Sequence, residues 1–155
     1  MERTLVLIKP DGIQRGLVGE IISRFERKGL KMLGCKMMAL DEAILREHYA
    51  HIADKPFFPG VAEFMKSSPV LAMCWEGLEA VEAVRLITGV TKGRTADAGT
   101  IRGDLAMSVS CNVIHTSDSV ENAKKEVARF FNPDDLYDYK KGEYEHVYNQ
   151  EERES

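Results

Sequence analysis

The sequence contains little cysteine, no surplus of positive charge and no long apolar run. Its three cysteines, Cys35, Cys74 and Cys111, each lie in an apolar segment, so we expect buried free thiols in a reducing compartment and no disulfide framework. The 25 acidic residues outnumber the 21 lysines and arginines, which argues against the broad basic surface that long nucleic acids require. No segment approaches the roughly 20 apolar residues of a membrane-spanning helix, and the first residues lack the features of a secretory signal. We therefore expect a cytoplasmic protein with no membrane and no obligate nucleic-acid partner.

Two common nucleotide-binding motifs are also missing, namely G-x-x-x-x-G-K-[ST] and a G-x-G-x-x-G that follows a strand. A nucleotide site in this chain would therefore have to hold phosphates with side-chain cations. The candidate cations are Lys9, Arg85, Lys92, Arg94 and Arg102. Arginine suits this role because its guanidinium can donate two parallel hydrogen bonds to phosphate oxygens.

Two hydrophobic patterns alternate along the chain. Short, largely apolar runs bounded by turn residues predict strands over residues 3–9, 31–40, 70–75 and 109–115. Apolar residues at helical spacing predict helices over residues 19–28, 41–52, 79–88 and 120–131, and a shorter one through Phe64 and Met65. Pro10-Asp11-Gly12 predicts a turn, and residues 89–104 predict a long polar loop of the kind that is usually functional or mobile.

The length of 155 residues fits one compact domain, and 44% hydrophobic residues are enough to build its core. We expect a single domain over residues 1–155, with a polar tail from about residue 132 whose end frays. The element order predicts an α/β (α+β) fold of ferredoxin-like βαββαβ type, in which helices cover a four-stranded antiparallel sheet.

The segment from Asn112 to Ser119 carries the strongest indication of chemistry. His115 lies where a predicted strand meets a predicted helix, a position at which helix dipoles favour anions. Imidazole is largely neutral at physiological pH and can attack a phosphoryl group, although a strand-end histidine bonded to local backbone is an equally good interpretation. Strand alternation places Asn112 and His115 on opposite faces, so a bend is required if both bind one ligand. Asp118 and Glu121 can form a capping-box pair at the start of the next helix.

Glu126 and Arg102 each admit a functional and a structural interpretation. Glu126 lies at the edge of its helix's apolar stripe, where it can accept a hydrogen bond from an imidazole or pair with a neighbouring cation. Arg102 lies between two glycines in the segment 99–104, so it can approach a ligand closely or be held in a turn by Asp104.

Two further pairs are weaker candidates. Phe57 and Phe58 lie between prolines, and they either join the core or form a rigid aromatic edge on which a base could stack. His48 and His51 have a helical spacing that can bind metal, but no third ligand of suitable type is near them in the sequence, so we expect a structural role.

Taken in order, these residues resemble the nucleoside diphosphate kinase family. The matching stretches extend from residue 3 to about residue 136, and they are Ile8-Lys9-Pro10-Asp11-Gly12, Gln14-Arg15-Gly16-Leu17-Val18-Gly19, His48-Tyr49, Pro56-Phe57-Phe58, Gly99 to Asp104, and Asn112 to Ser119. Six spaced matches over nearly the whole chain are specific, whereas any one of them alone would be weak.

The resemblance implies a ping-pong reaction, in which a nucleoside triphosphate phosphorylates His115 and a nucleoside diphosphate then removes the phosphate. It implies that Glu126 and Ser117 orient His115, that Tyr49 lies close to it, and that Lys9 takes part in catalysis. Nucleotide binding is implied for six residues: Lys9, Phe57, Arg85, Thr91, Arg102 and Asn112. Among these, Arg85, Thr91 and Arg102 would hold the phosphates, Lys9 and Asn112 the sugar hydroxyl and the transferring phosphate, and Phe57 the base.

The resemblance also implies cofactor and partners. Mg²⁺ is expected on the nucleotide's phosphates with no direct protein ligand, and Asp118 would meet it at most through water. The substrates would be nucleoside tri- and diphosphates such as ATP, GTP and deoxynucleoside diphosphates, with broad base and sugar specificity. A homo-hexamer is expected, with a homo-tetramer as the alternative.

The stretch from Thr91 to Ala98 departs from the family pattern. It lacks the proline of the usual Thr-Asn-Pro-Ala loop and carries Lys92 and Arg94 instead. The departure concerns the rigidity of this loop and the oligomer contacts made there, while Thr91 and Arg102 remain in place.

Overall fold

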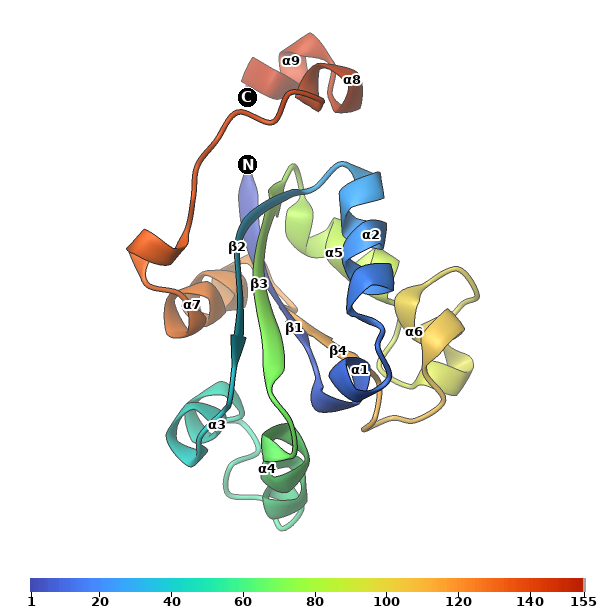
Figure 1. Cartoon of the computed structure of the whole chain (residues 1–155), viewed down its shortest axis with the longest axis vertical. Coiled ribbons are helices and arrows are strands. Elements are labelled where there is room, and N and C mark those ends of the chain that lie inside the picture. Colours follow the sequence, from blue (N-terminus) through green and yellow to red (C-terminus); the bar gives the residue numbers. More distant parts are fainter. Residues whose placement is uncertain (155) are drawn as a thin grey trace.

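The computed structural model describes residues 1–154 and arranges them around one four-stranded antiparallel sheet (Figure 1). The spatial order is β2-β3-β1-β4, with β1 at Glu2–Ile8, β2 at Lys31–Met38, β3 at Val70–Gly77 and β4 at Ile114–Thr116. β1 pairs with β3 over its whole length and with β4 over three residues, which sets His115 opposite Leu7. This topology confirms the predicted ferredoxin-like fold.

Helices cover both faces of the sheet. The longer ones are α2 (Val18–Lys28), α3 (Glu42–His48), α4 (Phe58–Lys66), α5 (Ala80–Thr88) and α7 (Val120–Phe130). The shorter ones are α1 (Pro10–Gln14), α6 (Ile101–Leu105), α8 (Tyr144–Val147) and α9 (Gln150–Glu154), with 3-10 turns η1 (Gly93–Thr95) and η2 (Pro133–Asp135). Within residues 1–154, no helix is long and apolar enough to cross a membrane.

Successive residues of β1 serve two separate hydrophobic clusters, one on each face of the sheet. Leu5 and Leu7 pack with side chains of α3, α4 and α7, whereas Val6 and Ile8 pack with side chains of α2, α5 and α6. Because both faces are covered, residues 5–8 are all buried, and this explains why that part of the strand is continuously apolar instead of alternating. β1 therefore holds Lys9 and β4 at fixed positions at the end of the sheet.

Three predicted element boundaries are wrong. The expected turn at Pro10-Asp11-Gly12 is the start of a short helix, which proline favours at its first position. The helix expected over 41–52 ends at His48, so Tyr49 follows the helix instead of lying inside it. The expected loop 89–104 contains η1 and the first residues of α6.

The fourth strand is also shorter than predicted. Only Ile114–Thr116 pairs with β1, and residues 109–113 are irregular. The cap of α7 differs as well, because Ser119 accepts the hydrogen bond from the Asn122 backbone N–H, while Asp118 accepts one from the Asn122 side chain. The predicted pairing of Asp118 with Glu121 is therefore not the cap.

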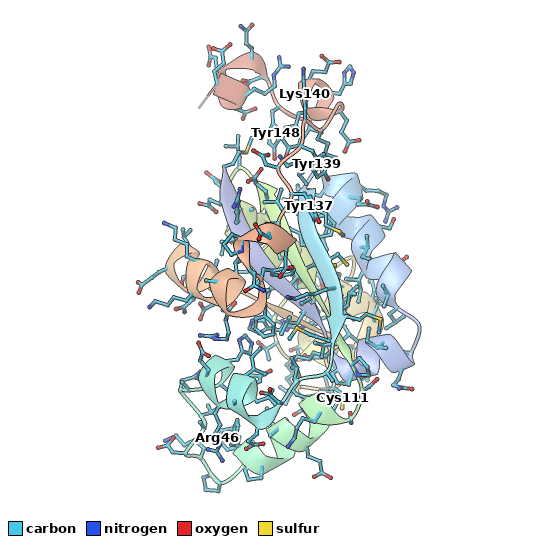
Figure 2. The ribbon with its side chains drawn as sticks, turned by 60° about the vertical axis from the view of Figure 1, so that its left-hand side comes forward. Arg46, Cys111, Tyr137, Tyr139, Lys140 and Tyr148 are labelled. Atoms are coloured by element: carbon cyan, nitrogen blue, oxygen red, sulfur yellow. The ribbon has the colours of Figure 1, made fainter. Side chains whose placement is uncertain are left out.

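The tail after residue 131 is attached to the sheet through side chains in its first part. Figure 2 shows Tyr137, Tyr139 and Tyr148 following it along one end of the molecule, far from Cys111. The Tyr139 hydroxyl donates to the Met32 carbonyl at 2.9 Å, and Lys31 reaches Asp138 at 2.8 Å, so the tail is fastened to β2.

The cysteine prediction holds only for one residue. Cys74 is buried in β3, whereas Cys35 and Cys111 are exposed, and all three are free thiols. Cys35 lies on β2, an edge strand, and Cys111 lies in the irregular stretch before β4, so an apolar sequence context did not ensure burial at either position.

Candidate active site

The approach to β4 is a tight turn that places Asn112 and His115 on one pocket. Val113 has a φ of 64°, and the Ile114 N–H donates to the Asn112 carbonyl across it at 2.9 Å. Positive φ is strained for a β-branched residue. The turn is held by Asp11, whose carboxylate accepts from the Val113 N–H at 3.0 Å, and by the Lys9 N–H, which donates to the Val113 carbonyl at 2.9 Å. This is the bend that the sequence pattern required.

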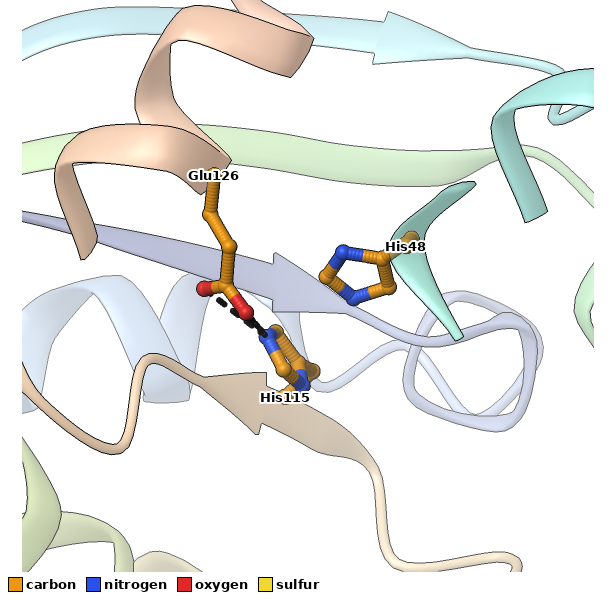
Figure 3. Close-up of side chains that lie close together, drawn as sticks. All are labelled: His48, His115 and Glu126. Carbon is orange, nitrogen blue, oxygen red and sulfur yellow. Dashed lines mark hydrogen bonds and ion pairs between the residues drawn. The ribbon is translucent and has the colours of Figure 1, made fainter. Parts of the chain in front are cut away.

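His115 is bonded through one ring nitrogen and keeps the other available. Its Nε2 lies 3.2 Å from both carboxylate oxygens of Glu126, and Glu126 Oε2 also accepts from the Ser117 hydroxyl at 2.5 Å (Figure 3). Burial acts to raise the pKa of Glu126, but the hydrogen bonds and charge of His115 and the bond from Ser117 outweigh it, and the pKa lies below its ordinary value. An ionised carboxylate can only accept, so Nε2 carries a proton, and in the neutral ring Nδ1 then carries the lone pair.

Lys9 lies at the end of β1 beside Asn112. Its ammonium donates to Asn112 Oδ1 at 2.8 Å, and the Asn112 amide donates to the carbonyls of Thr91 and Val109. Burial, followed by the nearby Arg102 charge, lowers the pKa of Lys9 to about 8, although Asp11 acts in the opposite direction. The ammonium is thus a poorly solvated cation that an anionic ligand would stabilise.

Arg102 is buried, and it both holds the backbone of the site in place and adds a positive charge to it. Its guanidinium donates to the carbonyls of Gly89 at 3.1 Å, Asn112 at 3.4 Å and Ile114 at 2.6 Å. Burial and the Arg85 charge lower the pKa of Arg102 to about 10, so it remains a cation at neutral pH. A guanidinium has five N–H donors, so two remain for a ligand. Asp104 does not hold Arg102, because it pairs with Arg24 at 2.8 Å.

These groups line an open pocket of about 690 Å³, large enough for a small phosphorylated ligand. Nine of the side chains predicted from the sequence line it: Lys9, Tyr49, Arg85, Thr91, Arg102, Asn112, His115, Asp118 and Glu126. Ser117 lies behind Glu126 and is buried. Among the described residues, Phe57 lies outside the pocket lining, at the start of α4 with 58% of its surface exposed, whereas Phe58 is buried in the core.

The sequence interpretation gave His48 a structural role and did not single out Arg129. His48 is buried, its ring stacks edge-on against His115 with centroids 4.5 Å apart, and Arg129 Nη1 lies 3.1 Å from its Nδ1. Burial, followed by the neighbouring His115, lowers the pKa of His48 to about 3. The spacing of Arg129 three residues after Glu126 puts both on one side of α7, which is the sequence signal that could have found it.

Tyr49 stays a neutral phenol beside these groups. Burial and the Glu126 charge raise the pKa of its hydroxyl to about 12. It can therefore donate a hydrogen bond to a negatively charged ligand throughout the physiological pH range.

The donor atoms available for a divalent cation are of two kinds. One donor atom each from His48, His115 and Glu126 lie within 4.8 Å of one another, but two imidazoles are not donors that Mg²⁺ selects, and Glu126 is already bonded to His115. Asp118 is exposed at the pocket and accepts from the Asn122 amide at 2.6 Å, which, ahead of any other cause, holds its pKa below the ordinary value. This lone carboxylate fits a cation carried mainly by a ligand's phosphates.

The chain is similar to known proteins over nearly all of its length. The family model described as nucleoside diphosphate kinase matches residues 2–136. A nucleoside diphosphate kinase of Parabacteroides distasonis is 52% identical over 139 residues, covering 90% of this chain and 91% of that protein. Nucleoside diphosphate kinase A of Homo sapiens is 52% identical over 138 residues, covering 89% and 91% respectively. The halophilic nucleoside diphosphate kinase of Halobacterium salinarum, solved in complex with CDP, superposes with a TM-score of 0.93 at 47% identity, covering 96% of this chain and 99% of that one.

Proposed function

This chain belongs to the nucleoside diphosphate kinase family and is an enzyme of that activity, and from that premise we propose that it transfers phosphate through His115 by a ping-pong mechanism. The observation that carries the proposal is the bond between His115 Nε2 and Glu126, which in the neutral ring puts the proton on Nε2 and the lone pair on Nδ1, at a cationic pocket. A neutral imidazole with one nitrogen fixed by a carboxylate is an activated nucleophile.

The proposed chemistry has two symmetric halves. The Nδ1 lone pair of His115 attacks the γ-phosphorus of a nucleoside triphosphate, the bond to the bridging oxygen breaks, and the nucleoside diphosphate leaves with that electron pair. Glu126 balances the positive charge that the imidazole ring acquires, and Ser117 holds the carboxylate in place. A second nucleoside diphosphate then attacks the phosphorus through its terminal oxygen, and His115 returns to its starting form.

The cations and donors of the pocket have separate roles in this proposal. Arg85, Thr91 and Arg102 hold the phosphates, while Lys9 and Asn112 contact the sugar hydroxyl and the transferring phosphate. Tyr49 donates its hydroxyl near His115. Phosphoryl transfer depends chiefly on positioning and on neutralising charge, so this set can replace a phosphate-binding loop. Mg²⁺ on the nucleotide would add further charge neutralisation, with Asp118 reaching it through water.

Base selection is expected to be broad. We assign Phe57 to stacking on the base because it is exposed at the start of α4, although it does not line the pocket of the free protein. Stacking uses a face that every base has, which favours ATP, GTP and deoxynucleoside diphosphates alike as substrates. The complex of the halophilic relative with CDP supports acceptance of a pyrimidine nucleotide.

We also propose a single catalytic domain per chain and a homo-hexameric assembly, with a homo-tetramer as the alternative. The mass in solution distinguishes them, because a hexamer would have six times the chain mass of 17.4 kDa. A cytoplasmic location remains a prediction from the sequence.

Steady-state kinetics test the two-step mechanism. With ATP and dTDP varied against each other in the presence of Mg²⁺, a ping-pong reaction gives parallel double-reciprocal lines. Intersecting lines would mean that both nucleotides must be bound together, which contradicts the proposal. Chelation of Mg²⁺ is expected to abolish most of the rate.

A further inference from the structure

The contact between Arg129 and His48 fixes where His48 carries its proton. Arg129 Nη1 lies 3.1 Å from His48 Nδ1. A guanidinium has only donors, so this distance is a hydrogen bond only if Nδ1 is unprotonated. The neutral ring then carries its single hydrogen on Nε2.

Several contacts hold this pair in one geometry. Arg129 Nε lies 3.1 Å from Glu47 Oε1, and the guanidinium side chain is only 14% exposed. The His48 ring is packed edge-on against Tyr49, Phe130 and His115, with centroid distances of 4.9, 5.2 and 4.5 Å. Because the ring is enclosed on these sides, it cannot easily turn over to exchange its two nitrogens.

The other nitrogen of His48 faces the reacting histidine. In Figure 3, Nε2 of His48 points toward His115, and one donor atom each from these two rings and Glu126 lie within 4.8 Å of one another. Nε2 is buried and has no hydrogen-bond partner among the described residues. The charged or titratable groups around His48 are His115 from β4, Glu126 and Arg129 from α7, and Tyr49 and His51 from the segment after α3.

We propose that Arg129 is a positioning residue, which holds His48 as the Nε2–H tautomer so that His48 offers no lone pair to His115 and Glu126 alone accepts the His115 Nε2–H. In the opposite tautomer, Nε2 of His48 would present a lone pair to the same space and compete with Glu126 for that proton. Arg129 thus acts on the nucleophile through His48, which lines the pocket. The kinetic part of this inference rests on the proposed role of His115, whereas the tautomer itself does not.

Nitrogen NMR of the full chain, labelled with ¹⁵N in its four histidines, tests the tautomer directly. We expect His48 Nε2 to give the signal of a protonated nitrogen and Nδ1 that of an unprotonated one, between about pH 6 and pH 8. In Arg129→Met we expect a detectable fraction of the opposite tautomer, whereas Arg129→Lys, which keeps a cation and an N–H donor, should retain the parent form. A parent His48 with its proton on Nδ1, or a His48 spectrum that Arg129→Met leaves unchanged, would overturn the proposal.

The rate of His115 phosphorylation in a single turnover with ATP provides the second readout. In Arg129→Met it should fall in proportion to the molecules left in the competent tautomer, about two- to tenfold, with the ATP concentration at half-saturation unchanged. Arg129→Lys should recover most of the rate. In a His48→Gln background, which has no tautomers, Arg129→Met should have no further effect, and an equal loss there would contradict the coupling.

Lys124→Met is the matched control, because it removes a cation from the same helix at an exposed position that makes no contact with His48. It should leave both the NMR signals and the rate unchanged. If His115 were not the nucleophile, His115→Ala would keep its activity while the His48 tautomer stayed as described, so the two ideas fail separately.

Discussion

Glu126 is expected to orient the His115 ring through its ionised carboxylate. It is largely buried, with its side chain 13% exposed, and its two strong partners are the His115 ring and the Ser117 hydroxyl. Removing its charge would leave the imidazole free to move its proton to Nδ1, where it blocks attack on phosphorus.

Glu126→Gln therefore tests the orienting role of the carboxylate. The amide can donate to His115 Nε2 and so favour the wrong tautomer, and we expect His115 phosphorylation to slow by about 10²- to 10⁴-fold. Rapid-quench measurement with ATP gives the rate. Glu121→Gln, at an exposed position of the same helix, is the control, and a Glu126→Gln rate within a few-fold of the parent would contradict the assignment.

Deprotonation of Lys9 is expected to set how kcat/KM for ATP falls at alkaline pH. Its pKa of about 8 is below the ordinary value because of burial and the Arg102 charge, so the free enzyme loses this cation as the pH rises through about 8. We expect kcat/KM for ATP to fall over that range, whereas kcat should hold to higher pH because bound phosphate favours charged Lys9. Lys9→Gln should have a lower kcat/KM for ATP at neutral pH and should not show this decrease at alkaline pH. A decrease that persists in the variant would mean that another group causes it.

At the scale of elements, the buried strands could be predicted from sequence because a strand that is covered on both faces has a continuous run of apolar residues. The run of residues 5–8 is apolar throughout and all of it is buried. The turn at Val113, near the end of the predicted strand 109–115, could not be predicted in this way. Its geometry depends on Asp11, which lies 102 positions earlier, and on Arg102, which takes up three carbonyls of the surrounding backbone.

The same distinction applies to the site. Lys9 and His115 lie in the motifs that carry the family resemblance, and Glu126 was assigned only through that resemblance. Asn112 needed a bend that no local pattern encodes. His48 was interpreted as structural because its partner Arg129 is 81 positions away and the only local partner tested was His51, which is exposed.

Asp11→Ala tests whether the turn at Val113 depends on that one carboxylate. The buried Val113 N–H would lose its acceptor, and we expect a loss of about 1–3 kcal/mol in the free energy of unfolding. The displaced Asn112 should also raise KM for ATP. Asp11→Asn keeps an acceptor oxygen, so its free energy of unfolding and its KM for ATP should change less. Urea unfolding measures the first quantity and steady-state assays the second. If Asp11→Ala matches the parent in both, other groups hold the turn.

At the scale of the whole molecule, burying the neutral imidazole of His48 makes the stability of the fold sensitive to acid. His48 has a folded pKa of about 3 and an unfolded value near 6.5, so below about 6.5 the unfolded chain binds a proton that the folded chain does not. Stability is therefore full above about pH 6.5 and is lost as the pH falls toward 3, by up to ~1.4 kcal/mol per pH unit.

Urea unfolding at fixed chain concentration, compared at about pH 7 and pH 5, measures this dependence. His48→Gln cannot titrate and should show a shallower loss of stability over that interval. His51→Gln, which changes an exposed histidine, should follow the parent. The same slope in parent and His48→Gln would place the acid sensitivity elsewhere in the molecule.

The direct test of the central claim is the mass of the intact protein after brief treatment with Mg²⁺ and ATP. We expect one added phosphoryl group per chain that is lost in acid, retained in base and removed by dTDP. It should be absent from His115→Ala and present in His146→Ala, where an exposed histidine is changed. Labelling of His115→Ala to the level of the parent would contradict a phosphohistidine at residue 115.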